Sequence, residues 1–265
     1  NAQIVNNINA LFDLDDDPYI FGLIGSALAG NGGNGGKSDD DTPGNGGSGG
    51  MTESSADTGY GAGTVEITID ATSTISTSSA LFSVGVIGQS AGGQGGNAGG
   101  GGTAPWAKNA SGGNGGFSGP VSILNEGSIE LTLTGGLDAQ GAALLAQSVG
   151  GQGGNAGSGG FSFVTFGNTG GSGGPSDEVS IQHRGLITAT GTNAIGINAQ
   201  SVGGGGGSVP NSTSLISVGG SSGGAGGNAN NSSVEIDGGR VHTYGDYGIG
   251  VLVQSIGGGG GSVGG

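Results

Sequence analysis

The sequence contains no cysteine, and it has only four basic residues against 19 acidic ones. Without cysteine, disulfides, thiolate metal sites and cysteine nucleophiles are excluded. A chain with a net charge of −15 cannot neutralise a row of phosphates, so we expect no nucleic-acid partner and no adhesion to anionic lipid. No apolar run reaches the ~18 residues of a membrane helix, so we also expect no membrane insertion.

Aromatic residues are scarce, at 5% of the chain, whereas glycine supplies 72 of the 265 residues. Ordinary soluble domains contain about 7% glycine, and the excess leaves too few apolar side chains for the thick core of a globular enzyme. Glycine also loses the most conformational freedom on folding, so an ordered chain of this kind needs repetitive contacts. The composition therefore predicts a solenoid, a fibre or a disordered chain, and it suits a secreted bacterial surface protein.

Two short motifs recur with nearly the same spacing and define a repeat of roughly 55 residues. The motif Gln-Ser, which precedes a glycine-rich run, begins at Gln89, Gln147, Gln200 and Gln254. The motif Val-x-Ile begins at Val65, Val121, Val179 and Val234. We therefore predict four copies of one unit over residues 62–265. A degenerate copy around residues 21–33 precedes them, and the last copy ends inside its glycine run, as a piece of a longer array would.

Each unit holds three short stretches in which apolar and polar residues alternate: Val-x-Ile, a second stretch such as Ile129/Leu131/Leu133, and the run before Gln-Ser. Alternation with a period of two is typical of half-buried strands. One unit is too small to form a core alone, but stacked units with parallel, in-register strands would build a continuous interior. We therefore predict an all-β fold, a parallel β-helix or β-solenoid with coils about 4.8 Å apart.

In such a solenoid, equivalent residues of successive coils lie above one another and form ladders. We expect an inward valine ladder of Val65, Val121, Val179 and Val234. We expect Ile197 and Val251 in the apolar interior. We expect an amide ladder of Gln89, Gln147, Gln200 and Gln254, although glutamines that only face water would fit the same pattern. The serine after each glutamine would point inward.

The glycine half of each unit runs in Gly-Gly-x triplets, such as Gly92-Gly-Gln-Gly-Gly-Asn-Ala-Gly-Gly100. Such triplets suit a three-residue extended helix of the polyproline II type, here called polyglycine II-like, in which bare backbones approach closely. We predict that these excursions between coils are ordered and pack together. A flexible linker is the alternative, because Gly/Ser-rich strings usually behave as coils.

The unit Ala194-Ile-Gly-Ile-Asn-Ala-Gln-Ser-Val-Gly-Gly-Gly-Gly-Gly207, and its counterpart at residues 248–261, resemble the repeat of large glycine-rich bacterial autotransporter passengers. The resemblance extends well over residues 62–265 and loosely over residues 18–61. It implies type V secretion, a β-helical passenger, and a surface or adhesive role outside the bacterial cell. It supplies no catalytic residue.

Residues 1–61 differ from the repeats, and we divide the chain there into a capping segment with a degenerate first repeat (1–61) and the β-solenoid (62–265). Ile4, Ile8, Leu11 and Phe12 have the spacing of a short amphipathic helix, which would cap the first coil. A capping strand, or an arm that pairs with another subunit, is the alternative. The acidic run Asp13, Asp15, Asp16 and Asp17 offers a weak calcium site, but it lacks the spacing of known calcium loops. We otherwise expect no cofactor.

The two histidines, His183 and His242, fall at different places in the repeat, and we expect both to face solvent. The outward positions of the second strand, Glu130, Thr188 and His242, form no catalytic constellation, so we do not expect an enzyme. We expect a structural or adhesive extracellular repeat protein that self-associates end to end or side by side. A glycan- or ice-binding module is the alternative, suggested by the Ser/Thr-rich segment at residues 72–79.

Overall fold

The computed structural model describes residues 2–6, 9–13, 19–35, 62–99, 106–107, 110–157, 162–211, 214–218 and 220–264. These residues form five stacked coils, and each coil contributes one strand to each of three five-stranded sheets. Every strand pairing is parallel, so the predicted β-solenoid is confirmed.

The first sheet contains β1 (Ala2–Asn6), β4 (Val65–Ile69), β8 (Val121–Asn125), β12 (Val179–His183) and β16 (Ser232–Ile236). The second sheet contains β2 (Asn9–Asp13), β5 (Thr74–Ser79), β9 (Ser128–Leu133), β13 (Leu186–Thr190) and β17 (Arg240–Tyr244). The third sheet contains β3 (Tyr19–Leu28), β6 (Phe82–Ala91), β10 (Gln140–Val149), β14 (Ala194–Val202) and β18 (Ile249–Ile256). A small fourth sheet contains β7 (Trp106–Ala107), β11 (Ser162–Phe166) and β15 (Ser214–Val218). The turn η1 (Gly136–Asp138) is the one helical element in the described ranges.

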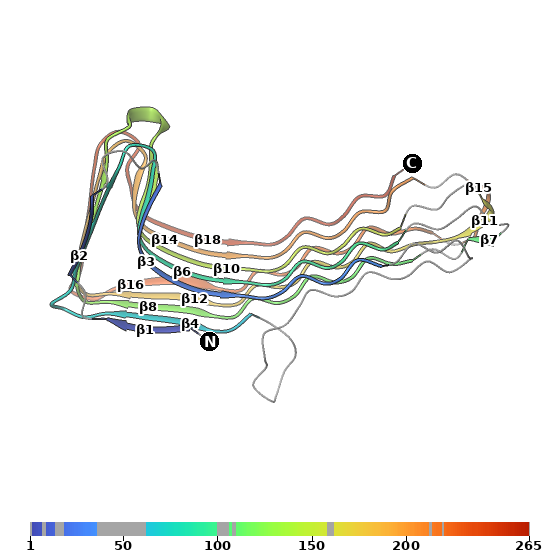
Figure 1. Cartoon of the computed structure of the whole chain (residues 1–265), viewed down its shortest axis with the longest axis horizontal. Coiled ribbons are helices and arrows are strands. Elements are labelled where there is room, and N and C mark those ends of the chain that lie inside the picture. The colour runs from blue at the N-terminus through green and yellow to red at the C-terminus, as the bar shows by residue number, and fades with distance from the viewer. Residues whose placement is uncertain are drawn as a thin grey trace.

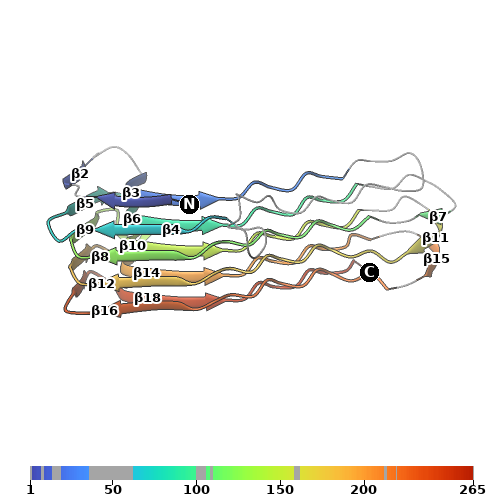
Figure 2. The same ribbon diagram turned by 90° about the horizontal axis from the view of Figure 1, so that it is seen from below.

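The molecule has two regions, which we call the β-head and the glycine tail. The three large sheets form the β-head at one end, and the small sheet lies at the far end of the tail (Figure 1). After β6, β10 and β14 the chain leaves the third sheet along an outgoing glycine tract, and it comes back along a return tract to the first-sheet strand of the next coil. The coils lie side by side in chain order through both regions (Figure 2).

The apolar interior of the β-head consists of ladders of β-branched residues and leucine. Ile67, Ile123 and Ile181 lie opposite one another in adjacent strands of the first sheet, and each is at most 1% exposed. Ile197 lies between Leu144 and Val251 in the third sheet and is fully buried, as expected. Val251 itself is 38% exposed, so its placement in the interior was wrong, because no described coil covers the fifth one. The core thus runs continuously along the stacking direction, which a single coil could not achieve.

The valine ladder differs from the prediction in its last member. Val65, Val121 and Val179 are neighbours in the first sheet, but Ser232 pairs with Val179 and Val234 pairs with Ile181. The prediction was therefore wrong for Val234 by two residues. A slip of two keeps each side chain on the same face of the strand, so the apolar pattern could not reveal it.

The N-terminal segment contains strands where a helix was the first prediction. Residues 2–6 and 9–13 form β1 and β2, which pair in parallel with β4 and β5. With β3 they complete a first coil that resembles the others, so the amphipathic helix was wrong and the alternative of a strand holds. Pairing with the next coil outweighs the weak helical periodicity of so short a segment.

The long third strand of each coil bends, so that its two halves face different sheets (Figure 1). A Cβ placed on Gly85 would contact Ile129 of the second sheet, whereas one placed on Gly88 would contact Val121 and Ile123 of the first sheet. Gly85 and Val86 are consecutive and both buried, which breaks the in–out alternation at the bend. The concave outer side of this bend, which we call the elbow, crosses successive coils.

Candidate functional site

The Gln-Ser motif lies where the β-head passes into the glycine tail. Gln89, Gln147, Gln200 and Gln254 occupy equivalent positions on the outer face of the third sheet. Each amide nitrogen donates to the amide oxygen of the next glutamine, over 3.4, 2.7 and 2.8 Å. Because the donor and acceptor of each amide serve opposite neighbours, the ladder bonds four coils in one chain of hydrogen bonds.

The serine of the motif points into the molecule and joins its two layers. Ser201 is fully buried; its hydroxyl donates to the carbonyl oxygen of Asp177 at 2.9 Å and accepts from the backbone N–H of Asn230 at 3.0 Å. Ser148 makes the same pair of bonds one coil earlier, to Gly119 and Asp177. Each serine therefore bridges two return tracts from the opposite layer, at the level where the apolar core ends.

The glycine tail is held by backbone hydrogen bonds in three directions. In the triplet Gly153-Gly154-Asn155, the N–H of Gly153 donates to Gly205 in the same layer, at 2.9 Å. The N–H of Gly154 donates across to Gly113 in the return layer, at 2.8 Å. The N–H of Asn155 donates to the side-chain oxygen of Asn97 in the preceding coil, at 2.8 Å. Every N–H of the triplet is thus satisfied by a neighbouring tract.

Both glycines of the triplet lie against backbone, whereas the third residue faces outward. A Cβ on Gly153 would collide with the carbonyl oxygen of Gly171, and one on Gly154 with that of Gly96. Close backbone approach therefore excludes a side chain at both glycines of this triplet. The tail is ordered in the way the glycine triplets predict, and not as a free linker.

The third residues of the outgoing tracts form a polar surface of side-chain amides. Asn31, Asn34, Gln94, Asn97, Gln152, Asn155 and Ser208 line a shallow depression of about 560 Å³ on this face. The oxygens of Asn31, Asn34, Asn97 and Asn155 accept backbone N–H groups of the next coil at 2.8–2.9 Å. These amides are therefore structural, since their acceptors already bind the neighbouring tract.

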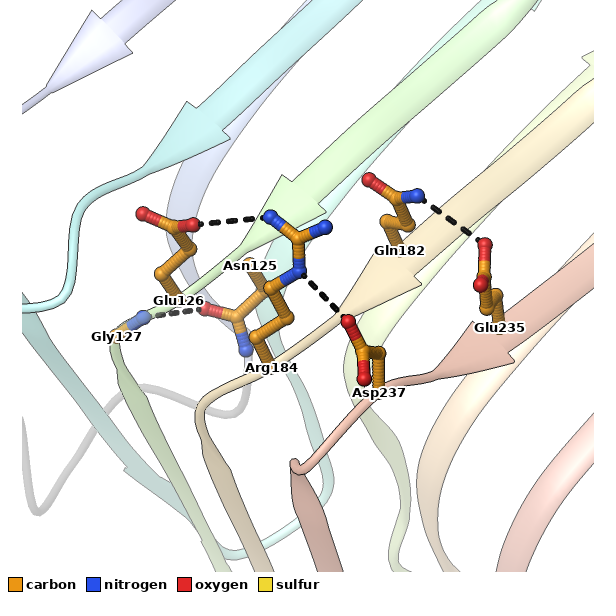
Figure 3. Close-up of polar contacts among 7 residues, drawn as sticks. All are labelled: Asn125, Glu126, Gly127, Gln182, Arg184, Glu235 and Asp237. Atoms are coloured by element: carbon orange, nitrogen blue, oxygen red, sulfur yellow. Dashed lines mark hydrogen bonds and ion pairs between the residues drawn. The ribbon is translucent and has the colours of Figure 1, made fainter.

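A charged corner lies where the first sheet turns into the second (Figure 3). The guanidinium of Arg184 lies 3.4 Å from a carboxylate oxygen of Glu126 in the preceding coil and 3.4 Å from one of Asp237 in the following coil. Gln182 donates to Glu235 at 3.1 Å beside it. The three charged side chains of the ion pairs are 36–65% exposed, so these pairs reduce the repulsion between the acids but add little stability.

His183 lies beneath this corner and is fully buried, so the expectation that it faces solvent was wrong. Its Nε2 lies 3.0 Å from the carbonyl oxygen of Arg240, and its Nδ1 lies 3.1 Å from the amide nitrogen of Asn125. The oxygen of Asn125 accepts the N–H of Gly127 at 3.1 Å, which orients the amide so that its nitrogen faces the imidazole. Both ring nitrogens therefore have a hydrogen-bond partner, and His183 serves as a satisfied core residue.

The remaining candidate catalytic and metal-ligating residues do not form a common site among the described residues. His242 is exposed on β17 and lies in one outward row with Glu130 and Thr188, as expected. Of the proposed calcium ligands, Asp13 ends β2, while Asp15, Asp16 and Asp17 lie outside the described residues. The described part of the chain contains no group of three potential metal-ligating side chains and no helix that could span a membrane.

The Ser/Thr-rich segment at residues 72–79 divides its hydroxyl groups between the interior and the outer face of the second sheet. Ser73, Thr77 and Ser79 are buried, at 2–4% exposure. Ser76 faces outward and donates to Glu130 at 3.3 Å. In the same row the next strands present Glu130, Thr188 and His242, so this row is not a run of hydroxyls. The outward row through Ser78 does continue as Thr132 and Thr190, and it reaches Tyr244 in the fifth coil.

Sequence reasoning missed the roles of the asparagines in the tail and of the buried Asn125–His183 pair. A signal for the first was present, because asparagine recurs as the third residue of the triplets. The second had no signal, because one coil has asparagine and the next has histidine at equivalent positions.

Comparisons with known proteins give little further identification. No family model matches the chain, and no curated protein matches it with significance. A solved structure with some likeness is the nine polyproline type II helical bundle springtail antifreeze protein from Granisotoma rainieri, at 19% identity, covering 80% of this chain and 94% of that one. The TM-score is 0.24, which is too low to establish a common fold.

Proposed function

We propose that this chain is a structural and adhesive segment of a bacterial surface protein, a rigid repeat array that performs no catalysis. The observation that carries the proposal is the continuity of hydrogen bonding between coils. Strand pairing and the glycine tracts join each coil to the next, and the glutamine ladder adds a bond between the last four coils. Such an array lengthens by adding units, which suits a passenger that projects from the cell.

The hydrogen-bond pattern of the tail, with bonds in three directions, supports a rigid structural role. It gives stiffness without a second apolar core, since each extended tract is braced by neighbours in both layers. The resemblance to autotransporter passengers supports the same role and an extracellular location. The strongly acidic composition favours solubility outside the cell.

Immunolabelling tests the location and the adhesive role together. Antibodies raised against the purified chain should label intact cells of the source bacterium, and their Fab fragments should reduce cell attachment. Labelling that requires permeabilised cells would contradict the surface location. Normal attachment in the presence of saturating Fab would contradict the adhesive role.

Self-association end to end or side by side remains a prediction. The apolar residues Ile249, Val251 and Val253 of the fifth coil are 38–43% exposed, and such surface favours contact with a further coil. Sedimentation velocity over a wide concentration range tests this. A single monomeric species at all concentrations would contradict it.

A further inference from the structure

The elbow of the third sheet contains a cavity that plays no part in the ladders described above. Its volume is about 380 Å³, and it is lined by residues of four successive coils, from Phe82 to Ile249. This volume lies within the usual range for small-molecule sites. Four coils span three coil spacings, or about 14 Å along the stacking direction.

The lining of the cavity combines aromatic rings, aliphatic side chains and neutral amides. Phe82 and Tyr247 come from the outermost of the four coils, and Gln140, Asn193 and Asn198 come from the coils between them. None of the described residues that line the cavity is charged. A charged ligand would lose its hydration here without gaining a partner, and the net charge of −15 further disfavours an anion.

Asn198 interrupts an otherwise apolar row. It pairs with Leu145 on one side and Leu252 on the other, and both are equivalent positions of the third sheet. Its side-chain oxygen is buried and has no hydrogen-bond partner. An unsatisfied buried acceptor is costly and calls for an explanation. Rotation about the soft terminal torsion of the side chain would turn this amide toward a ligand in the cavity.

Tyr247 at the rim has an unfavourable backbone conformation. Its φ is +59°, and the equivalent residue of the preceding coil, Asn193, has φ +57°. Asparagine tolerates this region, whereas a bulky residue is an outlier there. Tyr247 is also 75% exposed, so burial of its ring within the described chain does not explain why a tyrosine occupies this position. Strain of this kind is typical of functional positions.

We propose that the elbow binds a short, neutral, linear oligosaccharide that lies along the stacking direction. Sugar rings present apolar faces that pack on aromatic rings, and hydroxyl groups that pair with amides, which is the mixture that the cavity provides. A pyranose ring is close to one coil spacing in length, so successive rings would meet successive coils. An extended peptide fits less well, because the strands of the elbow already pair with each other on both sides. This site is independent of the structural role proposed above.

Calorimetric titration of the whole chain tests the proposal, with maltotriose, cellotriose and chitotriose as neutral probes and trigalacturonic acid as the acidic one. We expect saturable binding of at least one neutral probe and none of the acid. Asn198→Leu and Tyr247→Asn should each weaken that binding roughly fivefold to tenfold, the loss of about one hydrogen bond or ring contact. Gln182→Ala, on the first sheet, should leave it unchanged.

Both test variants are designed to fold. Leucine already occupies the positions on either side of Asn198, and asparagine already occupies the position equivalent to Tyr247 in the preceding coil. Their thermal melting curves should therefore match or exceed that of the parent. The proposal is overturned if no neutral probe binds, if trigalacturonic acid is preferred, or if either folded variant binds like the parent.

Discussion

The β-head and the glycine tail share one set of coils, yet different interactions hold them together. In the β-head, ladders such as Ile123/Ile181 fill the space between sheets, and burial of apolar area supplies the stability. In the tail, the space between layers is closed by backbone alone, as where Gly154 donates to Gly113. The tail is therefore sensitive to atoms added at the glycines that face another tract, whereas the head is sensitive to lost or charged atoms.

The boundary between the two regions shows how the chain changes from a side-chain core to direct contacts between backbones. Ser201 lies on this boundary, where the interior becomes too narrow for an apolar side chain but still needs a polar bridge. Gln200, its neighbour, faces outward and bonds successive coils instead. The Gln-Ser motif therefore provides one contact along the stack and one across it.

The largest effect should come from placing a charge in the head. Ile197→Asp buries a carboxylate between Leu144 and Val251, and we expect the free energy of unfolding to fall by about 4 kcal/mol or more. Chemical denaturation followed by circular dichroism measures this. Thr132→Asp, on the exposed face of β9, adds the same charge and should change stability by less than about 0.5 kcal/mol. Equal losses would show that Ile197 is not inside.

The second-largest loss of stability should come from adding a methyl group in the tail, and it should affect the tail and not the head. A Cβ on Gly204 would collide with the backbone carbonyl of Gly151, so Gly204→Ala should cost about 3 kcal/mol, the upper end for overpacking. Hydrogen exchange should accelerate at tail amides and stay slow in the head. Gly205→Ala is the matched control in the same tract, because its nearest neighbouring atom lies 3.8 Å away. If both variants exchange alike, the tail is not packed as described.

A smaller effect should distinguish the two halves of the Gln-Ser motif. Ser201→Ala leaves the Asp177 carbonyl and the Asn230 N–H without their buried partner, at a cost of about 1–2 kcal/mol. Gln200→Ala removes one half-buried rung and should cost about 1 kcal/mol or less. Denaturation midpoints measured side by side give the order. A greater loss for Gln200→Ala would make the outer ladder, not the inner bridge, the stronger contact.

The smallest effect should arise at the charged corner. Arg184→Met removes two exposed ion pairs while keeping most of the aliphatic stem, and we expect a loss below about 1 kcal/mol. The loss should shrink further at high salt, because screening weakens exposed pairs. Thermal melts at low and high ionic strength provide the measurement. A large, salt-independent loss would show that Arg184 supports the buried His183 beneath it.

The sequence alone determined the all-β class, the period of the repeat and the inward or outward direction of most strand residues. It could do so because repeated coils sum the same weak signals, as at Ile197, Gln200 and Ser201. The glycine triplets were also informative, because only bare backbone can approach other backbone so closely.

Only the tertiary structure decided the features that depend on which strands lie together. The place of Val234 came from the register of the whole coil, because a shift of two residues preserves the apolar pattern. The strands at residues 2–6 and 9–13 came from pairing with the next coil, which outweighed local helical spacing. The burial of His183 depends on its neighbours Asn125 and Arg240 in the adjacent coils, and the elbow cavity depends on the bend that the third strands of successive coils share. Such packing leaves no mark in the order of residues within any one repeat.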